Sequence, residues 1–181
     1  ADCAIADKWT RARMAMLGGA DLVLELPTVY AASSAEKFAR GAVELLHASG
    51  IVSHISFGSE CGDISLLNGA VDALENPRLS EAIKPHLAKG LTFAKARTLA
   101  VAELTSPEIA ALLEEPNNTL GIEYMLQLRQ LNSHVKPLTI PRKSVSHHEN
   151  TAVEGFASAS HIRSLLLDKE QESALSLVPE A

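Results

Sequence analysis

The sequence predicts an α/β fold with a parallel sheet. Short apolar runs that end at Gly or Pro alternate with longer segments whose apolar residues recur at helical spacing, which is typical of parallel α/β units. One apolar run leads through a Gly-containing turn straight into a helix, as strands of such sheets do at their carboxyl ends. The length of 181 residues suits one domain with a buried core.

The N-terminal part predicts a helix followed by a strand. Asp7 is placed to cap a helix that contains Trp9 and ends at Gly18-Gly19. The apolar run at 21–26 then predicts a buried strand. Glu25 is out of place in that run, because a lone carboxylate is costly in a core.

The next segment predicts a second helix and a second strand. Ser33 and Glu36 have the spacing of a capping box, and Gly50 is placed to end the helix that they start. Residues 51–57 predict the strand. Asp63 then caps a further helix.

The middle stretch is helical and has no strand candidate. A broken helical pattern runs from Ser80 to about Glu114. Pro85 is expected to kink or split one helix, and Ser106-Pro107 to start another. We therefore expect one domain over residues 1–181, with a helical insertion at about 78–115.

The last third returns to strand and helix signals. Residues 116–118 predict a break, 121–131 a helix and 137–141 a short strand flanked by prolines. A long polar loop follows at 143–156. The serines within 158–160 are then placed to cap a last helix.

Composition and charge exclude several classes of protein. Two cysteines outside any C-x-x-C motif argue against a disulfide scaffold or zinc ribbon and favour a reduced, cytoplasmic setting. No apolar run approaches the roughly 20 residues of a membrane span, so we expect no membrane association. The formal net charge of −6 argues against a strongly basic nucleic-acid module, although it leaves a local basic patch open.

Two turns carry residues that suit ligand binding. Gly58, between strand and helix, permits close approach of a ligand to the backbone, but it also suits a plain turn. Asn117 and Asn118 could read a purine edge or a ribose, and taken alone they are better explained as helix caps.

The last predicted helix begins with a phosphate-binding pattern. Ser158 and Ser160 lie beside free backbone N–H groups, and Arg163 adds a guanidinium within about one turn. An ordinary cap with a solvated arginine is the plain alternative. His147 and His148 have no third ligand at convincing spacing, so we expect no metal site.

Six segments together resemble the bacterial tRNA(Met) cytidine acetate ligase family, over nearly the whole chain. They are 7–12 (DKWTRA), 19–27 (GADLVLELP), 34–39 (SAEKFA), 56–60 (SFGSE), 116–124 (PNNTLGIEY) and 157–163 (ASASHIR).

The resemblance implies a Rossmann-like nucleotidylyltransferase fold and a specific reaction. Members of the family use ATP to activate acetate as acetyl-adenylate, and then acetylate N4 of the wobble cytidine of elongator tRNA(Met). Mg²⁺ is compatible with this reaction. The sequence leaves the oligomeric state and the residue that orients acetate open.

The resemblance also implies site residues. ATP would contact Gly58, Asn117, Asn118 and Arg142 on one side, and the motif of Ser158, Ser160 and Arg163 on the phosphate side. Lys8 and Arg11 would lie near the same edge, where they are candidates for phosphate or tRNA contact; Lys8 is equally well explained as plain surface. Glu25 would then face the site.

The chain departs from the family pattern at both ends. The family's first strand, its His-x-Gly-His segment and a loop before Asp7 have no counterpart here, nor has the C-terminal region that grips tRNA. We therefore expect an N-terminally incomplete domain, either an internal fragment or a chain with residues missing near Ile5. Nucleotidyl transfer in cofactor biosynthesis and a non-catalytic nucleotide-binding module stay open as alternatives.

Overall fold

The computed structural model describes residues 4–142, 157–168 and 170–178. The chain divides into two compact units. The central unit is Leu26–Arg142, and the terminal unit combines Ala1–Glu25 with Lys143–Ala181.

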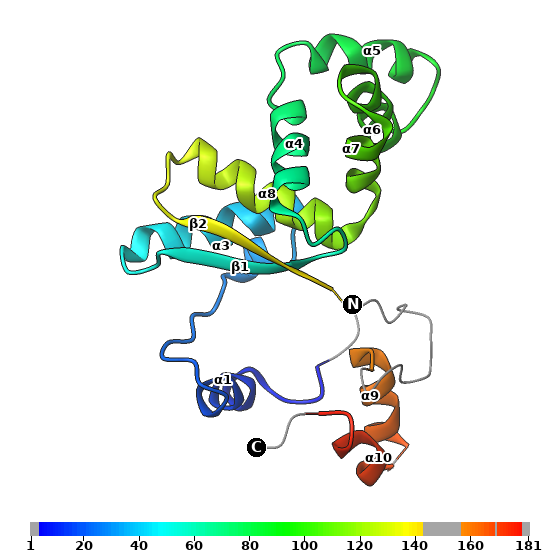
Figure 1. The fold of residues 1–181 in the computed structure, drawn as a ribbon. Coiled ribbons are helices and arrows are strands. Elements are labelled where there is room, and N and C mark those ends of the chain that lie inside the picture. Colours follow the sequence, from blue (N-terminus) through cyan, green and yellow to red (C-terminus); the bar gives the residue numbers. More distant parts are fainter. Residues whose placement is uncertain (1–3, 143–156, 169, 179–181) are drawn as a thin grey trace. The chain divides into compact units, whose positions relative to one another are not determined.

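The central unit contains a parallel sheet of two strands (Figure 1). Strand β1 (His54–Ser59) pairs with β2 (Lys136–Pro141), so that Gly58 lies opposite Ile140. The predicted parallel α/β fold is thereby confirmed, with β1 beginning three residues later than expected.

Two helices pack together on one side of this sheet, α3 (Ala35–Ser49) and α8 (Pro116–Gln130) (Figure 1). Apolar side chains from α3, β1, α8 and the residue before β2 form the shared core there: Val43, Ile55, Leu128 and Val135. Burial alternates along β1 because successive side chains of a strand point to opposite faces.

A further group of helices in the central unit extends away from the strands (Figure 1). They are α4 (Ile64–Leu74), α5 (Leu79–Ala88), α6 (Phe93–Leu104), α7 (Pro107–Ala111) and the 3₁₀ turn η1 (Leu112–Glu114). The stretch at 79–114 is helical as expected. That it is an insertion stays a prediction. Pro85 lies inside α5 and does not split it, because the helix continues to Ala88.

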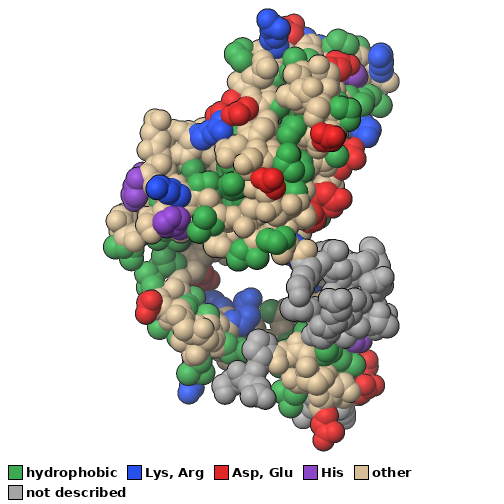
Figure 2. Space-filling model, viewed as in Figure 1, with side chains coloured by type: hydrophobic (Ala, Val, Ile, Leu, Met, Phe, Trp, Pro, Cys, Tyr) green, Lys and Arg blue, Asp and Glu red, His purple; other side chains and the backbone are tan. Residues whose placement is uncertain are grey.

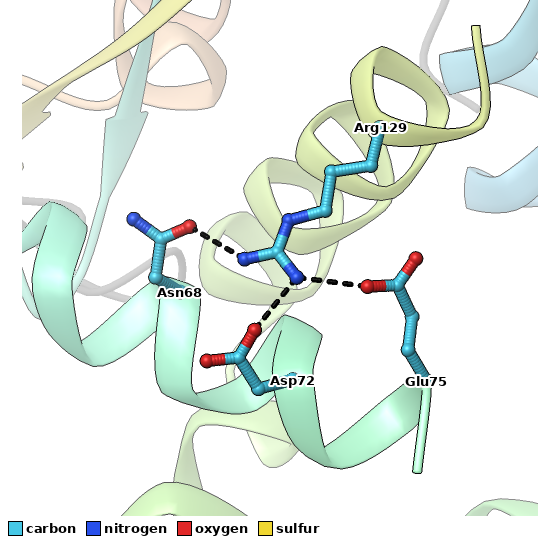
Figure 3. Close-up of polar contacts among 4 residues, drawn as sticks. All are labelled: Asn68, Asp72, Glu75 and Arg129. Atoms are coloured by element: carbon cyan, nitrogen blue, oxygen red, sulfur yellow. Dashed lines mark hydrogen bonds and ion pairs between the residues drawn. The ribbon is translucent and has the colours of Figure 1, made fainter. Parts of the chain in front are cut away.

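Side chains of α4 and α8 are also joined by a polar contact (Figure 3). Arg129 of α8 donates through Nη1 to Asp72 at 2.6 Å and to Glu75 at 2.8 Å, and through Nη2 to Asn68 at 3.0 Å. With the apolar core between the same helices, this contact holds α8 against α4.

Most predicted caps are present, but the capping box is wrong. Asp63 caps α4 and Ser106 caps α7. Helix α3, however, begins after Ser34, which makes no side-chain cap. Ser33 instead donates to the Val29 carbonyl of a short helix, α2 (Thr28–Ala31), because the chain already turns helically after Pro27.

The expected break at 116–118 is also wrong. Helix α8 begins at Pro116, five residues before the predicted start. Proline suits the first helical position, where its missing N–H leaves no hydrogen bond unmade. Asn117 and Asn118 therefore lie in the first turn of α8.

The terminal unit contains α1 (Lys8–Leu17), capped by Asp7, with α9 (Ala159–Leu167) and α10 (Gln171–Leu175). The predicted strand at 21–26 is not formed. A strand needs a neighbour to take its backbone hydrogen bonds, and no strand occurs among the described residues of this unit.

Of the remaining expectations for this part of the chain, the one on Glu25 is tested. Glu25 is exposed and forms an ion pair with Lys8, so it is not a buried carboxylate. The expected loop at 143–156, with His147 and His148, lies outside the described residues. Among the described helices, none combines the length and apolar character needed to cross a bilayer.

Candidate functional site

The carboxyl end of β1 leads into a tightly anchored turn. Ser59 is fully buried. Its Oγ lies 2.6 Å from Thr139 Oγ1 on β2 and accepts a hydrogen bond from the Gly62 N–H at 3.0 Å. The turn is thus tied both to the neighbouring strand and to the start of α4.

Gly58 and Arg142 lie against each other at this edge. A Cβ added to Gly58 would lie 3.0 Å from Cγ of Arg142. Arg142 is also held through its backbone, whose N–H donates to the Ser59 carbonyl at 2.9 Å. The missing side chain of Gly58 therefore lets the arginine stem lie on the backbone of β1.

Glu60 contacts the first turn of α8. Its Oε1 accepts from Nδ2 of Asn117 at 2.6 Å and from the Asn117 backbone N–H at 3.2 Å. Its Oε2 accepts from the Asn118 N–H at 2.7 Å. The N–H groups at a helix start have no partner within the helix, and a carboxylate is a favourable ligand for them.

These contacts control the pKa of Glu60. Burial raises the pKa, but the hydrogen bonds from the Asn117 side chain and from the Asn118 and Asn117 N–H groups outweigh it, so the pKa is held below its ordinary value of 4.5. A carboxyl group with a lowered pKa in the folded state stabilises the fold fully above the ordinary pKa. The contribution is lost as the pH falls through the lowered pKa.

Glu60→Gln is therefore expected to cost most stability near neutral pH. The difference in free energy of unfolding between the variant and the parent should shrink as the pH falls below 4.5. Urea denaturation at a series of pH values measures it. Exposed Glu108→Gln on α7 is the control, and an equal pH dependence in both variants would contradict the assignment.

The two asparagines have different surroundings. Asn117 Oδ1 accepts from Nη1 of Arg142 at 3.1 Å. Asn118 is buried, and its Oδ1 accepts from the Cys61 N–H at 3.1 Å. Neither caps α8, whose N-cap residue is Glu115. Both instead connect α8 to the turn after β1.

The predicted site residues divide between the two units. Gly58, Asn117 and Arg142 come together in the central unit, with Asn118 behind them. Their contact with ATP stays a prediction.

In the terminal unit, Ser158 caps α9 by accepting from the His161 N–H at 3.1 Å. Ser160 Oγ accepts from Nη2 of Arg163 at 3.0 Å. Phosphate binding by these three residues stays a prediction.

The two basic candidates lie on α1. Lys8 Nζ lies 2.9 Å from each oxygen of Glu25 and 5.2 Å from the centre of the Trp9 ring. Arg11 is exposed on the same helix. Contact of either with phosphate or tRNA stays a prediction.

Sequence reasoning missed the role of Glu60. Glu60 is the last residue of the segment 56–60 and directly follows the strand and its glycine, but its partners are 57 and 58 positions away. An acidic residue at a strand-to-helix turn is the signal that was available. Within the described ranges, no group of three or more His, Cys, Asp or Glu could hold a metal ion.

Comparison with known proteins shows which family the chain resembles. A model of the HIGH nucleotidyl transferase family matches residues 1–181. The chain is 45% identical over 180 residues to a tRNA(Met) cytidine acetate ligase from Caldanaerobacter subterraneus subsp. tengcongensis, covering 98% of this chain and 45% of the relative. A protein of the same name from Clostridium botulinum is 44% identical over 179 residues, covering 94% and 44%.

Solved structures show the same likeness. Thermotoga maritima TmcAL bound with alpha-thio ATP is 35% identical, with a TM-score of 0.83 over 96% of this chain and 42% of that one. The apo form is 34% identical, with a TM-score of 0.88 over 96% and 43%. The chain thus spans less than half the length of these relatives.

Proposed function

The chain belongs to the HIGH nucleotidyl transferase family, and on that premise we propose that it is the ATP-binding part of a tRNA(Met) cytidine acetate ligase. One observation carries this proposal. Gly58, Asn117 and Arg142 meet at the carboxyl edge of parallel strands, where α/β proteins bind nucleotides. They do so in a chain 35% identical to a protein whose crystal structure holds an ATP analogue.

The proposed reaction has two steps. A carboxylate oxygen of acetate attacks the α-phosphorus of ATP, and pyrophosphate leaves with the electron pair of the broken P–O bond. N4 of the wobble cytidine of elongator tRNA(Met) then attacks the acetyl carbon of the acetyl-adenylate, AMP leaves, and the amine loses a proton. A protein promotes the first step mainly by positioning the reactants and neutralising charge.

The chain's cationic groups suit that task. The stem of Arg142 lies against Gly58, and its guanidinium donates to Asn117. We assign to it a contact with the nucleotide, and to Ser158, Ser160 and Arg163 the phosphate side. Guanidinium and helix N-terminal N–H groups both bind phosphate oxygens. We propose that Mg²⁺ binds the ATP phosphates, because Mg²⁺ in proteins is commonly bound through the phosphates of the substrate.

The nucleic-acid partner is also part of the proposal. Figure 2 shows Lys, Arg, Asp and Glu side chains mixed over the visible face of the helices at 64–114, without a large patch of one sign. An overall charge of −6 is compatible with tRNA as substrate if the remaining length of the relatives supplies much of the cationic surface. A cytoplasmic location belongs to the same proposal.

The test is acetylation of an elongator tRNA(Met) transcript by the full-length natural protein with ATP and acetate, with and without a Mg²⁺ chelator. We expect ATP- and acetate-dependent incorporation of one acetyl group at the wobble cytidine. ATP binding without acetylation would overturn the tRNA assignment and favour a different adenylyltransferase.

Arg142→Ala is expected to weaken ATP binding by about tenfold or more, the usual effect of removing a hydrogen bond to a charged group. Titration calorimetry measures the dissociation constant. The matched control is Arg40→Ala, an exposed arginine of α3 that forms an ion pair with Glu44. ATP affinity equal to that of the parent would remove Arg142 from the site.

A further inference from the structure

Three side chains form a continuous hydrogen-bonded relay from the turn after β1 to the end of β2. Glu60 accepts from Nδ2 of Asn117 at 2.6 Å, and Oδ1 of Asn117 accepts from Nη1 of Arg142 at 3.1 Å. A carboxylate can only accept hydrogen bonds and a guanidinium can only donate them. The amide of Asn117 is therefore held in one orientation, with its NH₂ toward Glu60 and its oxygen toward Arg142.

Glu60 is itself held by α8. Besides the Asn117 side chain, its carboxylate accepts from the backbone N–H groups of Asn117 and Asn118 at 3.2 Å and 2.7 Å. These are first-turn donors, to which an anion would otherwise bind. Glu60 thus fills the anion position at the start of α8.

We propose that Glu60 is a positioning residue for the nucleotide, holding the guanidinium of Arg142 in place through Asn117. The inference rests on the proposed function, because it takes Arg142 as a nucleotide contact. It also assigns the phosphates to a position other than the start of α8, because the carboxylate of Glu60 already takes those N–H groups.

The benefit of the relay lies in ordering Arg142 before the nucleotide arrives. Arginine has a long side chain, and Arg142 is exposed. An exposed arginine that must be immobilised on binding costs affinity, and a side chain ordered in advance avoids that cost. In Glu60→Gln, the new NH₂ must face either the Asn118 N–H or the two donors of Asn117, and the negative charge is lost, so Asn117 is held less firmly in its orientation.

The test compares ATP affinity among Glu60→Gln, Arg142→Ala and the double variant, in the full-length natural protein. We expect Glu60→Gln to raise the dissociation constant of ATP about fivefold to tenfold. We also expect the double variant to bind ATP no more weakly than Arg142→Ala alone, because residues that act through one another are not additive. If Glu60 had a purely structural role, the rise in the dissociation constant of ATP in the double variant would be the product of the rises in the two single variants.

Two further variants separate positioning from helix capping. Asp63→Ala removes the side chain that caps α4, whose Oδ1 accepts from the Ser65 N–H at 2.7 Å. It should lower the melting temperature and leave ATP affinity unchanged. Asn117→Ala leaves the Asn118 N–H for Glu60 but removes the link to Arg142. It should reproduce the affinity loss in the parent with little loss of stability, and add no further loss in the Arg142→Ala background, whereas a direct contact of Asn117 with ATP would add to the loss.

The outcomes distinguish this inference from the proposed function. If the parent binds no ATP, the proposed function fails. If the parent binds ATP and Arg142→Ala weakens binding, but Glu60→Gln binds as the parent does or its loss multiplies with that of Arg142→Ala, only the relay is overturned. If Arg142→Ala binds ATP as the parent does, the relay is also overturned.

Discussion

Gly62→Ala is expected to lower the free energy of unfolding by about 3 kcal/mol, through two separate costs. Gly62 has a φ of +61°, a left-handed conformation that costs an L-residue about 1–2 kcal/mol. An added Cβ would also lie 2.5 Å from Cβ and 3.0 Å from Cα of Pro141 on β2. Overpacking against a strand that cannot easily move costs about 1–3 kcal/mol more.

Gly50→Ala is the matched control for this prediction. Gly50, at the end of α3, has a φ of +70°, but an added Cβ there meets nothing within 4 Å. Its replacement should therefore cost only the conformational part, about 1–2 kcal/mol. Urea denaturation measures both variants, and equal losses would show that Pro141 yields without cost.

Leu67→Ala is expected to cost about 3 kcal/mol, because it opens a cavity in the core between α4 and α8. Leu67 is fully buried beside Val71, Ile122 and Met125. The same denaturation experiment measures the loss. The neighbouring Leu66 is 41% exposed, so Leu66→Ala should cost much less. A similar loss in both variants would mean that the packing at Leu67 is not what stabilises these helices.

Both predictions concern the surroundings of the candidate site. Gly62 follows Glu60 by two residues, so a strained turn there should also displace the carboxylate from α8. Leu67 supports α8 from α4, together with the ion pairs of Arg129 in Figure 3. The position of α8 therefore depends on packing well away from the residues assigned to ATP.

Features that depend on residues close together in the chain could be predicted from the sequence. Asp7 and Asp63 cap the helices that follow them, and Gly50 ends α3 with positive φ. In each case the residue acts on backbone groups within a few positions along the chain. The parallel strand pair could likewise be predicted, because the pattern of apolar runs and turns indicates it.

Two predictions were wrong for reasons that do not appear in the local sequence pattern. Residues 21–26 have the composition of a strand, but a strand exists only with a partner, and composition does not supply one. At Ser33, the carbonyl of Val29 competes for the hydroxyl group. Ser33 and Glu36 have the spacing of a capping box, but α3 begins only after Ser34, so Ser33 does not cap it.

The sequence by itself determined the fold class, most of the caps and the family resemblance, because these depend on neighbouring residues or on the order of motifs. Only the tertiary structure decided what Asn117 does. Its side chain could cap a helix or contact a ligand, and it lies between Glu60 and Arg142, which are 57 and 25 positions away. The bonding of an amide depends on which donors and acceptors surround it, and folding alone brings those three residues together.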